Sequence, residues 1–183
     1  LWIPYRKRTY LYWFKFLQEA ERSPDFKVNW RKYRGWGGSN EVMGSKFDDW
    51  WNDHWKDLFS VPSKGSDLSK VKFPLTTTQP KTEAIRISWL VWLHRNTPAD
   101  YKPRLSQVAG GTYYPKRGSN SLAIARKIIA TEKRNTYLAS LDPDDEFNEN
   151  DDKAILGLVA RYKRRAKKTN ENVCQGKILK TVI

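Results

Sequence analysis

The strongest constraint on the fold is a run of large aromatic side chains at helical spacing in residues 45–59. Ser45 has capping-box spacing to Asp48, and Asp48 and Asp49 suit the positive end of a helix. The apolar positions, which share one half of the helical circumference, are Phe47, Trp50, Trp51, Trp55, Leu58 and Phe59. A helix with so broad an aromatic face must bury it, so we expect the chain to fold around an aromatic core.

Further helices are predicted on both sides of this segment. Thr9 is the expected N-cap of a helix over residues 9–22, whose apolar positions are Tyr10, Trp13, Phe14, Leu17 and Ala20. Residues 27–40 contain three glycines and are expected to form an aromatic-rich loop. Later helices are predicted over residues 98–108, over 121–139, and from Asp152 into the basic stretch 161–168.

Residues 84–94 predict a strand instead. Ile85, Ile87, Trp89, Val91 and Leu93 alternate with Arg86, Ser88, Leu90, Trp92 and His94, and β-branched and aromatic residues are enriched. Shorter strands are expected at 71–75 and in the tail 177–183. The predicted fold class is therefore α+β, predominantly helical, with a small sheet around a central strand at 84–94.

Composition along the chain predicts three regions. An aromatic-rich helical region covers residues 1–61, and a linker or loop rich in Ser, Lys, Thr and Pro covers 62–82. A basic α+β region follows over 83–183. The length of 183 residues also suits one compact domain that contains all three.

The charge of the chain favours a polyanion as its partner. The sequence has 34 Lys and Arg against 20 Asp and Glu, which gives a formal net charge of +14. Seven of the acidic residues lie in the segment 142–152, so the rest of the chain carries 34 basic against 13 acidic residues, a net of +21. Such a field attracts phosphate backbones by counterion release, which predicts a DNA- or RNA-binding protein. The acidic segment is expected to be a plain loop; the alternative is a nucleic-acid mimic that covers the basic surface.

Clusters of cations and two tryptophans are the candidate nucleic-acid contacts. They are Arg6, Lys7, Arg8, Trp30, Arg31, Lys32, Arg34, Trp36, Lys116, Arg117, Arg126, Lys127, Arg161, Arg164, Arg165, Lys167 and Lys168. The cations would grip phosphates, while Trp30 and Trp36 would either stack on unpaired bases or pack onto the core. A helix-turn-helix over residues 105–139 would fit only in an irregular form, because the interval 110–120 is far longer than its usual turn.

Catalytic chemistry finds little support in the sequence. Asp49, Asp53 and Asp57 form a carboxylate row beside His54, which is typical of a solvated helix face and leaves a metal-dependent nuclease as the weakest alternative. The one cysteine, Cys174, has no paired histidine motif, so no thiol nucleophile is expected. We therefore expect no enzyme activity, no catalytic residue, no bound metal and no cofactor.

Other partners and the cellular location follow from the same features. A single cysteine excludes a disulfide framework and fits a reducing, cytoplasmic location. No apolar run approaches the roughly 20 residues that span a bilayer, so no membrane association is expected. The excess of aromatic residues suggests an alternative function, in which the chain is an assembly subunit or adaptor that docks on a protein or nucleoprotein complex.

Two aromatic motifs near the N-terminus carry a resemblance to known proteins. They are Tyr12-Trp13-x-x-Phe16-Leu17 and Phe47-x-x-Trp50-Trp51-x-x-x-Trp55-x-x-Leu58-Phe59. Over about the first 60 residues the chain resembles a group of uncharacterised proteins from bacterial mobile elements and prophages, in which a similar pair of helices occurs. The resemblance implies a mobile-element or antiviral-defence context and supplies no catalytic residue.

Overall fold

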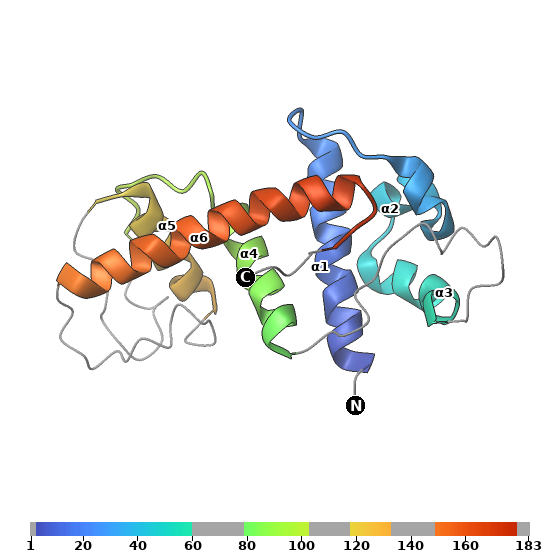
Figure 1. The fold of residues 1–183 in the computed structure, drawn as a ribbon, viewed down its shortest axis with the longest axis horizontal. Coiled ribbons are helices and arrows are strands. Elements are labelled where there is room, and N and C mark those ends of the chain that lie inside the picture. The colour runs from blue at the N-terminus through green and yellow to red at the C-terminus, as the bar shows by residue number, and fades with distance from the viewer. Residues whose placement is uncertain (1–2, 60–78, 103–117, 133–148, 179–183) are drawn as a thin grey trace. The chain divides into compact units, whose positions relative to one another are not determined.

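The computed structural model describes residues 3–59, 79–102, 118–132 and 149–178. Figure 1 shows their helices in chain order: α1 (Ile3–Arg22), the 3-10 helix η1 (Trp30–Trp36), α2 (Gly38–Gly44), α3 (Phe47–Phe59), α4 (Gln79–Leu93), α5 (Asn120–Glu132) and α6 (Glu149–Cys174). Within these ranges, no helix is both long enough and apolar enough to cross a membrane. The strands predicted at 71–75 and, for the most part, in the tail lie outside the described residues.

The segment predicted as the central strand of a sheet is part of helix α4. The α+β prediction is therefore wrong, because the four described ranges contain helices and no strand. Apart from Arg86 and Ser88, residues 85–93 are all apolar. Both the two-residue alternation of a strand and the broad apolar face of a helix therefore fit this segment. The buried positions follow the helical period and are Thr82, Ile85, Ile87, Ser88, Leu90 and Val91.

The chain divides into two compact units. The first consists of Leu1–Ile85 and Lys168–Ile183, and the second of Arg86–Lys167, so both boundaries fall inside helices, α4 and α6. The division predicted from composition stays a prediction, because most of the proposed linker lies outside the described residues.

The core of the first unit is a cluster of aromatic rings around Trp36. The Trp36 ring lies 4.7 Å from that of Trp50, 5.1 Å from those of Trp13 and Tyr33, and 5.7 Å from that of Tyr10. Most of these pairs meet edge to face or tilted, which the ring quadrupoles favour. Helices α2 and α3 lie beside α1 in Figure 1 and contact it, so the aromatic faces predicted for residues 9–22 and 47–59 share one core.

Two local expectations for this unit need correction. Residues 27–40 are not simply a loop, because η1 and the start of α2 form there, and η1 buries Tyr33 and Trp36. Thr9 does not cap α1, which begins six residues earlier, at Ile3. Thr9 is instead fully buried, and its hydroxyl shares a 3.1 Å hydrogen bond with that of Thr82.

The Tyr33 hydroxyl connects three segments of the first unit. It accepts a hydrogen bond from Trp13 Nε1 at 2.9 Å and donates one to the Val173 carbonyl oxygen at 2.5 Å. The Asn29 amide also donates to the Cys174 carbonyl oxygen at 2.9 Å. The segment around η1 therefore donates to two carbonyl groups in the last turn of α6, where partners within the helix are lacking. The Val173 carbonyl oxygen also accepts from the Gly176 amide at 3.1 Å.

In the second unit, polar side chains position the start of α5. The Ser119 Oγ accepts a hydrogen bond from the Leu122 amide at 3.1 Å, as an N-cap does. Asn120 donates to the Thr97 carbonyl oxygen at 2.5 Å and accepts from Lys163 Nζ on α6 at 2.8 Å. One amide side chain therefore joins α5, α6 and the segment after α4.

Removing the Tyr33 hydroxyl tests its role in the first unit. Tyr33→Phe keeps the ring but leaves Trp13 Nε1 and the Val173 carbonyl oxygen buried without this partner. The Val173 carbonyl oxygen still accepts from the Gly176 amide at 3.1 Å. Loss of the hydrogen bond from Trp13 Nε1 costs about 1–3 kcal/mol, so we expect the free energy of unfolding to fall by about 1–3 kcal/mol. Urea unfolding measures this change, and a loss below about 0.5 kcal/mol would contradict the assigned role.

Candidate nucleic-acid interface

Helix α6 presents most of the predicted cations of its second half to solvent. Arg161, Arg164, Lys167 and Lys168 are exposed, whereas the side chains on the opposite face are buried. These buried residues are Ile155, Val159, Tyr162, Ala166, Thr169, Asn170, Val173 and Cys174. The apolar positions recur at the helical period, so the packing of one face holds the cations of the other outward.

The cations of α6 differ in their partners. Lys168 pairs with Glu171 at 3.0 Å, and the Arg165 guanidinium lies over the Tyr162 ring, 5.5 Å from its centroid. No carboxylate in the described part of the chain forms an ion pair with Arg161, Arg164 or Lys167. We refer to these last three residues as the α6 cation row.

The predicted cations of α5 have structural roles within the second unit. Arg126 is only 6% exposed and donates to the Tyr101 carbonyl oxygen at 3.1 Å. Lys127 is half-buried, with its Nζ 4.9 Å from the centroid of the Tyr101 ring. Both side chains thus hold the segment at Tyr101 against α5, and Arg126 has no surface left to offer a phosphate. Lys116 and Arg117 lie outside the described residues.

The candidate cations of the first unit are divided between α1 and η1. On α1, Lys7 pairs with Asp48 at 2.9 Å and Arg8 is exposed. Arg6 also belongs to α1, but its side chain lies outside the described part. On η1, the exposed cations are Arg31 and Arg34, and Lys32 is half-buried. This unit therefore offers a second set of exposed cations on η1.

The two tryptophans proposed to stack on bases have different environments. Trp36 is fully buried at the centre of the aromatic cluster, so its ring is not available to a base. Trp30 is half-buried; its Nε1 donates to Glu21 Oε2 at 2.9 Å and its ring meets that of Tyr33 edge-on. The spacing of three residues from Tyr33 to Trp36 matches a 3-10 turn, and this signal could have indicated a shared buried face.

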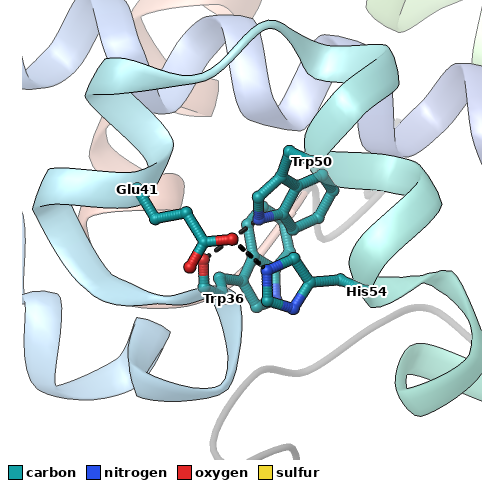
Figure 2. Close-up of polar contacts among 4 residues, drawn as sticks. All are labelled: Trp36, Glu41, Trp50 and His54. Atoms are coloured by element: carbon teal, nitrogen blue, oxygen red, sulfur yellow. Dashed lines mark hydrogen bonds and ion pairs between the residues drawn. The ribbon is translucent and has the colours of Figure 1, made fainter.

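His54 has a carboxylate partner that the sequence did not indicate. Figure 2 shows its Nε2 facing Glu41 Oε1 of α2, at 2.5 Å, while Trp50 Nε1 donates to the Trp36 carbonyl oxygen at 3.0 Å. The imidazole also lies 5.2 Å from the Trp50 ring. These contacts give His54 a packing role between α2 and α3.

The carboxylates and the thiol considered for catalysis have the following surroundings in the described part of the chain. No group of three or more His, Cys, Asp or Glu residues within them could hold a metal ion, and Asp49, Asp53 and Asp57 lie exposed along α3. Cys174 is a buried free thiol, and burial raises its pKa. A raised pKa keeps the thiol protonated and therefore poorly nucleophilic.

Comparisons of the chain with protein-family models, with curated proteins and with solved structures found no match. The function is therefore inferred from the geometry and charge of the chain itself.

Two adjacent glycines allow a matched test of the Glu41–His54 contact. Gly37 and Gly38 both adopt positive φ, at 82° and 75°. A Cβ on Gly37 would collide with the Glu41 carboxylate and lie 2.7 Å from Glu41 Cβ, whereas one on Gly38 would meet nothing within 4 Å.

We expect the free energy of unfolding to fall by about 1–2 kcal/mol in both alanine variants, because alanine disfavours the left-handed conformation. Gly37→Ala should lose about 1–3 kcal/mol more, because Glu41 must move away from His54. Thermal or urea unfolding of Gly37→Ala and Gly38→Ala measures the difference. Equal stabilities of the two variants would show that Glu41 does not occupy this position.

Proposed function

We propose that the protein is a non-enzymatic nucleic-acid-binding protein that contacts phosphates through the α6 cation row. The supporting observation is that Arg161, Arg164 and Lys167 are exposed on one face of a well-packed helix and form no ion pair with any described carboxylate. Residues three apart on a helix are neighbours, so the row spans about 9 Å along the axis. Guanidinium and ammonium groups in such an arrangement suit phosphate oxygens.

The structure accounts for the aromatic excess without a docking partner. Trp13, Trp36, Trp50 and Trp51 are buried in the core of the first unit. Among the described residues, the large hydrophobic side chains that remain exposed are Trp55, at 38%, and Leu93, at 54%. Burial in the core is a second explanation of the aromatic excess that motivated an adaptor function, so this feature does not favour an adaptor over nucleic-acid binding.

The cellular setting is part of the same proposal. The buried, free thiol of Cys174 supports a reducing, cytoplasmic location. The resemblance of the aromatic motifs to mobile-element and prophage proteins supports a role in such an element or in antiviral defence. Neither point is needed for the binding proposal, which rests on α6.

Charge removal on α6 tests the proposal. The variant Arg161→Gln/Arg164→Gln/Lys167→Gln should bind nucleic acid at least tenfold more weakly, since each charge-assisted contact contributes about 1 kcal/mol or more. Fluorescence anisotropy at near-physiological salt, with labelled duplex and single-stranded probes of one sequence, measures the affinity. Thermal unfolding should show that the variant remains folded, because the three side chains are exposed.

The matched control removes the same charge elsewhere. Arg22, Lys27 and Lys46 are also exposed, and their replacement by Gln lowers the net charge of +14 by the same amount. Their effect should be smaller, because these side chains are not part of the row proposed to contact the phosphates, and salt weakens longer-range attraction over a Debye length of about 8 Å. Equal weakening in both variants would mean that net charge, and not the α6 row, determines binding.

A further inference from the structure

We infer that the α6 cation row recognises the phosphodiester backbone of a duplex, DNA or RNA, and does not hold an unpaired strand through its bases. This inference rests on the proposed function and names the class of nucleic acid that the same site takes. Two observations support this inference. Packing of α6 fixes the spacing of the three cations, and other cations of the chain lie over aromatic rings that could otherwise stack on bases.

The cations of the row stand on a rigid support. Val159, Tyr162 and Ala166 on the opposite face are at most 7% exposed, so packing fixes the rotation of the helix about its axis. Each strand of a B-form duplex presents about one phosphate per 3.4 Å of axis, so roughly three phosphates of one strand fall within the axial length of about 9 Å that the row spans. Both partners are then rigid before they meet, whereas a single strand would have to be ordered on binding.

Three rings of the second unit lie beneath the chain's own cations. The Arg165 guanidinium lies over Tyr162, the ring within the same stretch of α6, and Tyr162 is itself buried. Lys127 covers Tyr101 in the same way, and the Arg95 guanidinium lies 4.3 Å from the centroid of the Trp92 ring. A base would have to displace these cations to reach the rings.

Proteins that hold single strands combine cations with exposed aromatic platforms. Beside the α6 row, the Tyr162 ring is buried and lies beneath the Arg165 guanidinium, so it is not an exposed platform for a base. The row therefore contacts the phosphate backbone and makes no contact with the bases. Contacts to phosphates position a protein on a duplex without sequence information. Binding through this row should therefore be independent of base sequence.

The experiment compares three probes of equal length with the full chain: a DNA duplex, an RNA duplex of the same sequence and the corresponding single strand. Affinities are measured by anisotropy over a salt series. We expect at least one duplex to bind more tightly than the single strand, and scrambling its sequence to change the affinity less than about twofold. The slope of log K against log salt should fall in magnitude by about 0.9 per lost contact, or about 2.7 in the Arg161→Gln/Arg164→Gln/Lys167→Gln variant.

A second variant separates backbone contact from base stacking. Trp30 is the half-buried tryptophan of the basic segment around η1, and Trp30→Leu removes its ring. We expect duplex affinity to stay unchanged in this variant once thermal unfolding has shown that it is folded.

The outcomes distinguish failure of the inference from failure of the proposed function. Single-strand binding that equals or exceeds duplex binding, or a strong dependence on base sequence, would overturn the inference and leave nucleic-acid binding standing. A large loss of duplex affinity in Trp30→Leu would also overturn it. Absence of binding to every probe would overturn the proposed function itself.

Discussion

The first unit depends on one buried hydroxyl group. Tyr33 is fully buried, accepts a hydrogen bond from Trp13 and donates one to the Val173 carbonyl oxygen. Burial, and to a smaller extent the charge of Cys174, raises the pKa of Tyr33 above its ordinary value, against the opposing effect of the Trp13 hydrogen bond. The hydroxyl thus keeps its proton and remains a donor. Because this bond satisfies a carbonyl group in the last turn of α6, the chain's C-terminal helix is fixed to the same core as α1 and η1.

The packing of α6 itself matters for function because this helix carries the exposed cations. A helix of 26 residues with a continuous buried face holds its opposite face in a defined orientation. The net charge alone does not distinguish a cation that is free to meet a phosphate from one that holds the fold together. Arg126 supports a backbone carbonyl and Lys163 supports Asn120, whereas Arg161, Arg164 and Lys167 extend into solvent. The proposal therefore rests on fewer residues than the charge of the sequence suggested.

Local patterns predicted the amphipathic helices well. The helix predicted in residues 45–59 forms over Phe47–Phe59, and Trp50 and Trp51 are buried as their spacing indicated, whereas Trp55 of the same predicted face is 38% exposed. Helices were also correctly expected within residues 9–22, 121–139 and 152–168, although their ends differ. The exposure of the basic side of the last helix followed from the same periodicity.

Features that depend on distant partners were not predictable. Residues 85–93 are largely apolar, so their sequence pattern fits both a strand and a helix. The strand prediction failed because packing against distant residues stabilises the helix. Thr9 resembled an N-cap but hydrogen-bonds Thr82, which is 73 residues away, and His54 meets Glu41 from another helix. Trp36 lay in a glycine-rich basic segment, and its burial follows from rings on α1 and α3 that no local window includes. Among the candidate site residues, the helical period indicated the exposure of Arg161, Arg164 and Lys167, but it did not indicate the burial of Arg126 or the contacts with distant partners.

Residue-resolved lysine labelling tests the central claim most directly. Lys163 and Lys167 are one turn apart on α6, yet the first donates to Asn120 and the second is exposed. With an acetylating reagent and mass spectrometry, Lys167 should react faster than Lys163 in the free protein. Added duplex should slow the reaction of Lys167 and leave that of Lys163 unchanged. Equal reactivity of the two lysines in the free protein, or a Lys167 rate that saturating duplex does not change, would contradict the account.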